Sequence, residues 1–315
     1  MNVYGENNKS NVTFTNDQAD AVDDLISFIA APWSDTDYVH ALCGAGGTGK
    51  TFVTKYVIQN CKFSSSVIAC AAPTHKACRV FSNAIGGKSV DTIQSMFGFR
   101  LDVDIEDFDP EKPAFNPIGN IKILDKEIRV LIIDESSMLN GKLVNYINKL
   151  CKKHHIKIIY IGDASQLPPV NEKVSRAFTI ATRVNYLNET VRQGDNNPIS
   201  NLLDILRNDI SRGRYDMLNY IANPKNKSQY NERGCGYTVC SPQEFDYHIE
   251  QAFTNEEYTK NVDMYKIIAY TNACVTQWNN YVRKSIIKGA DKNIITKNDL
   301  IMSYAVSYTH LRAHE

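Results

Sequence analysis

Four short apolar segments, rich in β-branched residues, recur along the first half of the chain, at residues 38–43, 66–72, 129–134 and 156–161. Their length and composition predict buried strands. The stretches between them predict helices over residues 50–60, 74–85 and 143–151. An amphipathic helix capped by Asn16 is expected before the first strand, ending ahead of Pro32. This alternation predicts an α/β fold, with a parallel sheet covered by helices on both faces.

Residues 101–120 interrupt the alternation, because they are rich in Asp, Pro and Phe, and they predict an inserted loop or small hairpin. A helix over residues 198–208 then leads into a polar, Asn-rich stretch at 219–233, a candidate boundary or mobile connection. Residues 265–270 predict another buried strand. The face of the helix after it is marked by Val275, Trp278, Val282 and Ile286. We therefore expect a second α/β unit.

Composition narrows the class of protein but does not identify a partner. A chain of 315 residues suits two lobes, and 43% hydrophobic with 22% charged residues is ordinary for a soluble globular protein. No apolar run approaches the span of a bilayer and no signal peptide begins the chain, so we expect a cytoplasmic protein without a membrane segment. The net charge of zero gives no argument for a polyanionic partner.

Eight cysteines are present, and none forms a CxxC pair of the kind typical of zinc sites. Cys43, Cys70 and Cys240 stand in apolar, strand-like runs. Reduced, buried thiols are therefore favoured over disulfides or a metal site.

A glycine-rich segment joins the first predicted strand to the next helix, and it consists of Gly44, Ala45, Gly46, Gly47, Thr48, Gly49, Lys50 and Thr51. This pattern in this context is typical of the phosphate-binding loop, in preference to a glycine-rich turn without a ligand. Glycines let backbone N–H groups surround phosphate oxygens, and the helix N-terminus adds positive potential. Lys50 would reach the β- and γ-phosphates and Thr51 would ligate Mg²⁺, so ATP and Mg²⁺ are the expected cofactors.

Polar residues also follow the next two predicted strands. Asp134 and Glu135 end the strand at 129–134, at the sheet edge where nucleotides bind in such folds. Asp134 would hold Mg²⁺, mostly through water, and Glu135 would orient and deprotonate the attacking water. The alternative for this pair is a solvated acidic helix cap. Gln166, in the run 161–170 after the following strand, could reach the γ-phosphate as a neutral sensor of ATP.

Together these motifs resemble those of superfamily 1 DNA helicases of the RecD-like, phage Dda-like branch, over roughly residues 13–283. The resemblance implies a RecA-like P-loop NTPase lobe over 1–190 and the beginning of a second, incomplete RecA-like lobe over 191–305. It also implies that a small hairpin at about 98–122 acts as a strand-separating pin. By the same resemblance, Gln18 reads the adenine and Arg192 reaches the γ-phosphate across the lobe boundary.

The resemblance further implies contacts with a single nucleic-acid strand. Pro73, Thr74 and His75 match the segment that contacts its backbone. Thr92 could bind phosphate, and Phe97 could stack on a base or equally belong to the core. Gln94 stands where the family usually carries histidine. In the second lobe, the backbone contacts are assigned to Thr271 and Asn272.

The sequence thus predicts an ATP-dependent DNA helicase, a monomer moving 5′ to 3′ on single-stranded DNA up to duplex junctions, with replication or recombination proteins as further partners. Its expected location is the cytoplasm of a bacterial or phage-infected cell. Two family motifs of the second lobe, Thr-x-His-Lys-x-Gln-Gly and a Thr-Arg pair, do not occur, and residues 306–315 do not continue the pattern. We expect those ten residues to be non-native and the natural protein to be longer. A P-loop ATPase without unwinding, an inactive ATP- and DNA-binding fragment, and RNA as substrate stay open as alternatives.

Overall fold

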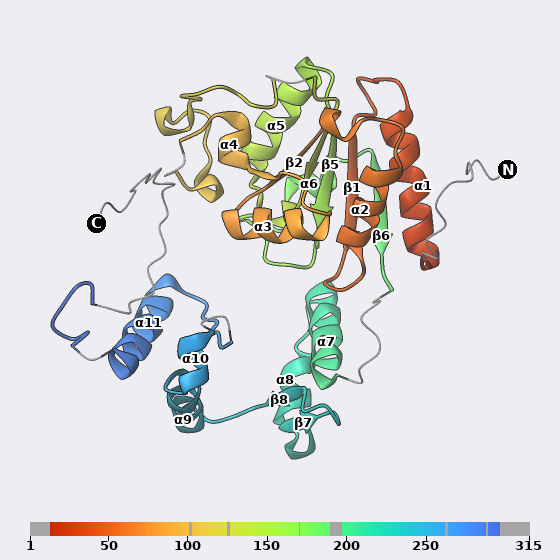
Figure 1. The fold of residues 1–315 in the computed structure, drawn as a ribbon. Helices are drawn as coiled ribbons and strands as arrows, with labels where there is room; N and C mark the ends of the chain where they lie inside the picture. Colours follow the sequence, from red (N-terminus) through yellow and green to blue (C-terminus); the bar gives the residue numbers. More distant parts are fainter. Residues whose placement is uncertain are drawn as a thin grey trace. The chain divides into compact units, whose positions relative to one another are not determined.

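The computed structural model describes residues 13–100, 103–124, 127–169, 171–189, 197–261, 264–287 and 289–296. The chain divides into two compact units, Met1–Asp195 and Asn196–Glu315 (Figure 1). The boundary expected after residue 190 falls among residues 190–196, outside the described ones. The candidate boundary at 219–233 is wrong, because that stretch lies inside the second unit and contains the end of a helix, a 3₁₀ turn and one short strand.

The first unit is built on a six-stranded parallel sheet, which confirms the predicted α/β fold. Its strands lie in the order β3-β2-β4-β5-β1-β6. Their bounds are β1 Val39–Gly44, β2 Ile68–Ala72, β3 Asp91–Thr92, β4 Val130–Ile133, β5 Lys157–Gly162 and β6 Arg183–Leu187. The four predicted strands are the four inner ones, and the two strands that were not predicted, β3 and β6, form the edges.

Helices cover both faces of this sheet because successive side chains of each strand point to opposite sides. Val130 and Ile132 of β4 pack into an apolar layer with helices α1 Asn16–Ala30, α2 Lys50–Asn60 and α3 His75–Ala84. Leu131 and Ile133 pack into the opposite layer with α4 Ile93–Phe97 and α5 Gly141–Lys153. The remaining helices of the unit are α6 Arg176–Thr179 and the 3₁₀ turns η1 Ser65–Val67, η2 Ile105–Asp107, η3 Pro113–Phe115 and η4 Ser136–Met138.

The cap of α1 differs from the prediction by one residue. Thr15, not Asn16, is the N-cap, since its hydroxyl accepts from the Gln18 N–H while the Gln18 side chain accepts from the Thr15 N–H. Asn16 is the first helical residue. This reciprocal pair is a capping box, and it fixes the direction of the Gln18 side chain at the start of the helix.

The inserted region is a packed loop in its described part, residues 98–100 and 103–122, where two 3₁₀ turns and no strand occur. Phe99, Phe108 and Phe115 are buried, and the first two contact the ring of Tyr146 on α5. These rings hold the described part of the segment against the domain as a loop. Its role as a strand-separating pin stays a prediction.

The second unit is mainly helical in its described residues, with α7 Pro198–Arg212, α8 Asp216–Ala222, η5 Pro224–Asn226, α9 Pro242–Phe253, α10 Glu256–Lys260 and α11 Asn272–Ile286. Strands β7 Ser228–Tyr230 and β8 Gly236–Thr238 form an antiparallel pair. The helix predicted around Trp278 is α11, but the strand predicted at 265–270 is wrong: Ile268 is 94% and Tyr270 97% exposed. A strand needs a neighbour to accept its hydrogen bonds, and the described residues offer none beside this segment.

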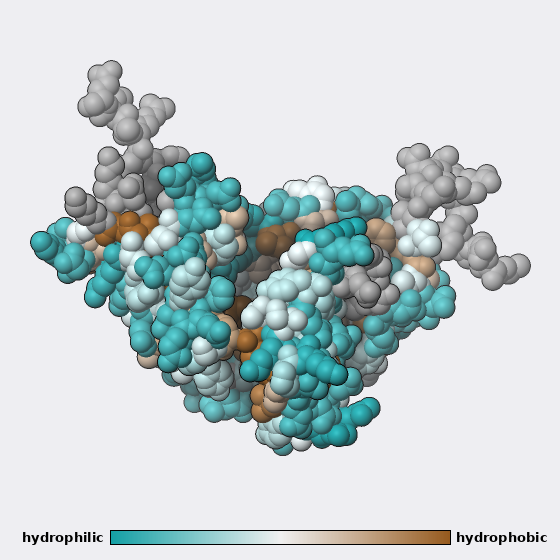
Figure 2. Space-filling view, turned by 90° about the horizontal axis from the view of Figure 1, so that it is seen from below, coloured by the Kyte–Doolittle hydropathy of each residue, from teal (hydrophilic) through white to brown (hydrophobic). Residues whose placement is uncertain are grey.

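The eight cysteines are all free thiols. Burial raises the pKa of Cys43 and Cys70 to about 12. Cys240 was expected in a strand-like run, but it is only partly buried and lies beyond the end of β8. Figure 2 shows a face made mostly of hydrophilic residues, with apolar residues in small patches. Among the described residues, no helix is both long and apolar enough to span a membrane.

Candidate nucleotide site

The phosphate-binding loop lies between β1, which ends at Gly44, and α2, which begins at Lys50. Gly47 and Gly49 have φ angles of 86° and 89°, in the left-handed region that glycine adopts without strain. A Cβ on Gly44 would lie 2.6 Å from the Thr48 hydroxyl and 2.8 Å from the Leu187 carbonyl oxygen. Gly47 and Gly49 are therefore required by the path of the backbone, and Gly44 is required by the closeness of Thr48 and β6, independently of any ligand.

The Lys50 side chain folds back over this loop. Its Nζ donates to the carbonyl oxygens of Gly44, at 2.6 Å, and Ala45, at 2.9 Å. Burial lowers the pKa of Lys50, while the negative charges of Asp163, Asp134 and Glu135 act in the opposite direction. The ammonium group thus lies between the loop carbonyls and the carboxylates that follow β4 and β5. Thr51, in the first turn of α2, is partly buried.

Two carboxylates follow β4 directly. Asp134 is tied to the neighbouring strand, since its N–H donates to the Ala71 carbonyl at 3.0 Å. Burial raises the pKa of Asp134 to about 6, with the charge of Glu135 adding to the rise and Lys50 opposing it. Glu135 has a φ of 52°, a left-handed conformation that is unusual for a residue with a side chain. Such backbone strain is concentrated at functional sites, where the surrounding structure enforces it.

A third carboxylate, which we did not predict as a site residue, follows β5. Asp163 is buried and accepts a hydrogen bond from the Ser165 N–H at 2.9 Å. Among the charges acting on the pKa of Lys50 its effect is the largest. Its position in the sequence could have identified it as a site residue, because it is acidic and directly follows β5, the strand between β4 and β1. Gln166 is exposed three residues later, and its backbone N–H donates to the Asp163 carbonyl.

Gln18 contacts the phosphate-binding loop from α1. The side chain is 2% exposed, and its Nε2 donates to the Thr48 carbonyl at 2.9 Å. A Cβ on Gly49 would lie 2.5 Å from the same nitrogen. The resemblance to a family motif predicts that Gln18 contacts the adenine of the nucleotide. The hydrogen bond from Gln18 to the phosphate-binding loop is an additional role, which no local sequence pattern indicates. Arg192 lies outside the described residues.

The three threonines predicted to contact nucleic acid share one structural role, because each is the N-cap of a helix. The Thr74 hydroxyl accepts from the Ala77 N–H of α3, that of Thr92 from the Ser95 N–H of α4, and that of Thr271 from the Cys274 N–H of α11. Thr74 and His75 are exposed, whereas Pro73 and Thr92 are buried. Thr271 and Asn272 are exposed in the second unit.

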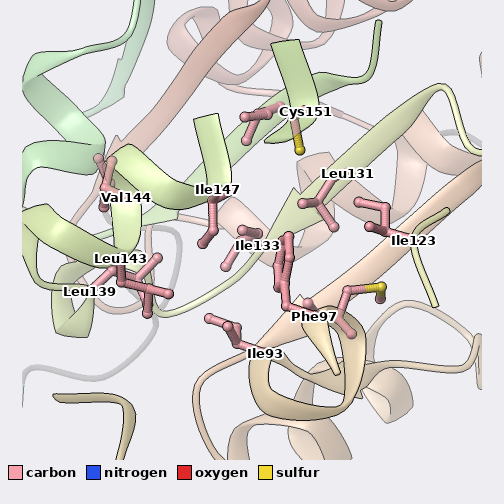
Figure 3. Packing of buried hydrophobic residues seen from close by; sticks show 14 of the residues in the cluster. Ile93, Phe97, Ile123, Leu131, Ile133, Leu139, Leu143, Val144, Ile147 and Cys151 are labelled. Carbon is pink, nitrogen blue, oxygen red and sulfur yellow. The ribbon is translucent and has the colours of Figure 1, made fainter. Parts of the chain in front are cut away.

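Phe97 is a core residue in this structure. Its side chain is 0% exposed and lies among Ile93, Leu131 and Ile133 (Figure 3). Stacking on a base requires an accessible ring face, and this ring has none. The base-stacking interpretation of Phe97 is therefore wrong here, and the core interpretation is the one that the packing supports.

Comparison with known proteins places this site in a family. A family model described as "AAA domain" matches residues 13–222. The chain is 27% identical over 289 residues to the ATP-dependent DNA helicase dda of Enterobacteria phage T4, covering 85% of this chain and 56% of that protein. It is 32% identical over 152 residues to the ATP-dependent DNA helicase PIF1 of Candida albicans, covering 43% and 15%.

Among solved structures, that of Bacteroides sp Pif1 in complex with ADP-AlF4 aligns with a TM-score of 0.47 at 21% identity, covering 85% of this chain and 56% of that one. The chain spans little more than half the length of the phage helicase and much less of the Candida protein. The AAA-domain match covers two thirds of the chain, and helicases recur among its relatives. The chain therefore belongs to the AAA-domain family and, within it, to the Dda/Pif1-like helicases of superfamily 1.

Proposed function

We propose that this chain binds ATP with Mg²⁺ and couples its hydrolysis to movement along single-stranded DNA and to duplex unwinding. The observation that carries the proposal is the gathering of Lys50, Asp134 and Asp163 at the carboxyl edge of neighbouring strands β1, β4 and β5. One cation among acidic groups, beside a loop of backbone N–H groups, is the arrangement that a magnesium-bound triphosphate requires.

The residues present fit Mg²⁺ and ATP chemically. Asp134 and Thr51 supply oxygen ligands, which Mg²⁺ prefers, and the remaining positions suit water and phosphate oxygens. The bound metal would neutralise charge on the phosphates. Lys50 would release the loop carbonyls of Gly44 and Ala45 and donate to phosphate oxygens instead. Glu135 would accept the proton of the attacking water, and exposed Gln166 would sense the γ-phosphate.

Binding of a single nucleic-acid strand is proposed for the exposed helix starts at Thr74 and His75 and, in the second unit, at Thr271 and Asn272. Free N–H groups at a helix N-terminus suit phosphate oxygens and carry no sequence preference. Thr92 is buried with its hydroxyl in a cap, so its contact would need its backbone rather than its side chain. DNA as the substrate and the 5′ to 3′ direction are inferred from the resemblance to Dda-like helicases.

The proposal is tested by comparing the wild-type chain with Lys50→Ala, using Lys62→Ala as the matched control because Lys62 is exposed beyond the end of α2. We expect binding of a fluorescent ATP analogue with Mg²⁺, and weak ATP hydrolysis that single-stranded DNA increases. Lys50→Ala should weaken nucleotide binding by about tenfold or more, since it removes a charge-assisted phosphate contact, and Lys62→Ala should not.

Nucleotide binding that is equal in wild type and Lys50→Ala would reject the site. Binding and hydrolysis without any response to single-stranded DNA would favour a P-loop ATPase without unwinding. Equal stimulation by DNA and RNA oligomers of the same length would reject the choice of DNA.

A further inference from the structure

An exposed aromatic ring lies at the start of α2, directly after the phosphate-binding loop. Phe52 is the third residue of that helix and follows Thr51, the predicted magnesium ligand. It is 43% exposed, whereas the next two residues, Val53 and Thr54, are buried. The first backbone N–H groups of a helix have no partner within the helix, and they suit phosphate oxygens. A nucleotide whose phosphates occupy the loop and these N–H groups would therefore have its nucleoside near the Phe52 ring.

Phe52 belongs to a cluster of three rings that joins α1 and α2, which lie side by side (Figure 1). The centroid of the Phe14 ring, just before α1, lies 5.5 Å from that of Phe52 and 4.9 Å from that of Tyr56. Phe14 and Tyr56 are partly buried and pack against the apolar layer on this face of the sheet. The exposed Phe52 ring is therefore supported by a ring that is itself fixed to the core.

The start of α1, which follows Phe14, is fixed next to the loop by hydrogen bonds. The Asp17 Oδ2 accepts from the N–H groups of Asn188, at 2.6 Å, and Glu189, at 3.1 Å, in the chain that follows β6. Gln18 donates to a carbonyl of the phosphate-binding loop. Because both contacts hold the same helix start, the ring that supports Phe52 keeps its place relative to the loop.

The Gln18 amide group, which was expected to contact the adenine, has protein partners at both of its ends. Its Nε2 donates to the Thr48 carbonyl at 2.9 Å, and its Oε1 accepts from the Thr15 N–H at 3.2 Å. The residue is 2% exposed. Hydrogen bonds to the edge of a base require an accessible donor or acceptor. Phe52 instead offers a surface that a base can contact without hydrogen bonds, the face of an exposed ring.

We propose that Phe52, supported by Phe14, is the residue on which the base of the bound nucleotide stacks. The inference rests on the proposed function and gives the site its class of ligand, the purine nucleoside triphosphates. The loop holds the phosphates and the Phe52 ring holds the base. Stacking on an aromatic side chain tolerates different bases, because every base has a π-face, and a purine buries more apolar area than a pyrimidine.

Two other roles of an exposed ring predict different losses. A ring that only covers the cluster beneath it would change the stability of the free protein. A ring that stacks on a DNA base would change the affinity for a single strand. A ring that holds the base of the nucleotide changes the affinity for nucleotides and leaves the affinity for a base-free triphosphate unchanged.

The experiment measures the Kd of AMP-PNP, GMP-PNP and inorganic tripolyphosphate, each with Mg²⁺, by calorimetry. Tripolyphosphate can occupy the loop but has no base. The proteins are wild type, Phe52→Leu, Phe52→Tyr, Lys50→Ala and the matched control Phe63→Leu. Phe63 is partly buried beyond the last residue of α2, at the end of the helix away from the loop. Thermal denaturation without ligand reports on the stability of each variant.

For Phe52→Leu we expect AMP-PNP and GMP-PNP to bind about fivefold more weakly or worse, since leucine keeps part of the apolar contact but loses the stacking. The Kd of tripolyphosphate should change less than about twofold. Phe52→Tyr keeps the ring and should bind all three ligands as wild type does. Phe63→Leu should also match wild type, whereas Lys50→Ala should weaken all three ligands.

AMP-PNP binding by Phe52→Leu within about twofold of wild type would overturn the inference. Equal weakening of tripolyphosphate would also overturn it, because the ring would then act on the loop and not on the base. Loss of affinity for oligothymidine with unchanged nucleotide binding would assign the ring to the DNA strand instead. Wild-type protein that binds neither AMP-PNP nor tripolyphosphate would reject the proposed function itself.

Discussion

Replacing Phe97 distinguishes a core residue from a base-stacking one, because the two roles predict changes in different quantities. The ring is buried on all sides, stacked on Phe99 at 6.2 Å between centroids and edge-on to Tyr146 at 6.1 Å. Removing a buried phenylalanine side chain costs about 3–5 kcal/mol, from lost burial and the cavity left behind. Leucine fills most of that volume, so Phe97→Leu should lower the free energy of unfolding by only about 1–1.5 kcal/mol.

A base-stacking role would leave stability almost unchanged and weaken DNA binding. Stacking contributes about 1–3 kcal/mol per base, which corresponds to roughly a 5- to 150-fold change in Kd. The structure instead predicts that Phe97→Leu changes the Kd for a fluorescently labelled oligothymidine by less than about twofold. Leucine is the informative replacement, because Phe97→Ala would remove a large share of the total stability of an ordinary domain.

The assay pairs urea denaturation with fluorescence anisotropy, and Phe52→Leu is the matched control. Phe52 is 43% exposed on α2, so the same change of side chain there should leave the urea midpoint nearly unchanged. If Phe97→Leu kept the wild-type midpoint and lost DNA affinity by more than about tenfold, the ring would have to reach the strand, and the packing argument would be refuted.

Three further changes probe the nucleotide site. Gly49→Ala should lower both thermal stability and affinity for the ATP analogue, since a left-handed alanine costs about 1–2 kcal/mol and its Cβ would lie 2.5 Å from the Gln18 Nε2. Glu135→Gln should retain the Kd of ATP and reduce steady-state hydrolysis by about 10²-fold or more, and undiminished hydrolysis would exclude Glu135 as the base. The pKa of Asp134 rises from 3.8 to about 6, so this group stabilises the folded metal-free protein below about pH 4, and that contribution is lost as pH rises through about 6. Asp134→Asn, measured with a chelator, should remove this loss and be the more stable protein at pH 8; a pH dependence identical to wild type would contradict the assignment.

The parts of the fold that could be predicted are those whose environment is uniform along the segment. Strands β4 and β5 are buried on both faces, so they appear in the sequence as continuous apolar runs. Strand β6 was not predicted because it lies at the sheet edge and carries polar or exposed residues at Arg183, Asn185 and Tyr186. The apolar segment at 265–270 shows the converse error, because hydrophobic composition alone does not supply a hydrogen-bonding neighbour.

The candidate site divides along similar lines. The phosphate-binding loop is local in sequence, and its glycines and Lys50 follow from the chemistry of phosphate binding alone. The contacts of Gln18 with Thr48 and of Asp17 with Asn188 join residues 30 and 171 positions apart, and no local pattern encodes them. The role of Phe97 is ambiguous in a different way, since a lone aromatic residue after a capping threonine fits a core and a binding surface equally well.

Several groups of the candidate nucleotide site would interact more favourably with a bound nucleotide than with their present partners. The Lys50 ammonium donates its hydrogen bonds to carbonyl oxygens of its own loop. Burial disfavours the ionised form of the Asp134 carboxyl group, and the backbone of Glu135 is left-handed. A magnesium-bound triphosphate would give Lys50 an anionic partner and give Asp134 a cation that favours its charged form. Part of the binding free energy would therefore come from relieving costs already present in the fold. Those costs would return on release of the phosphate and metal, so the proposed nucleotide cycle would shift the site between two states.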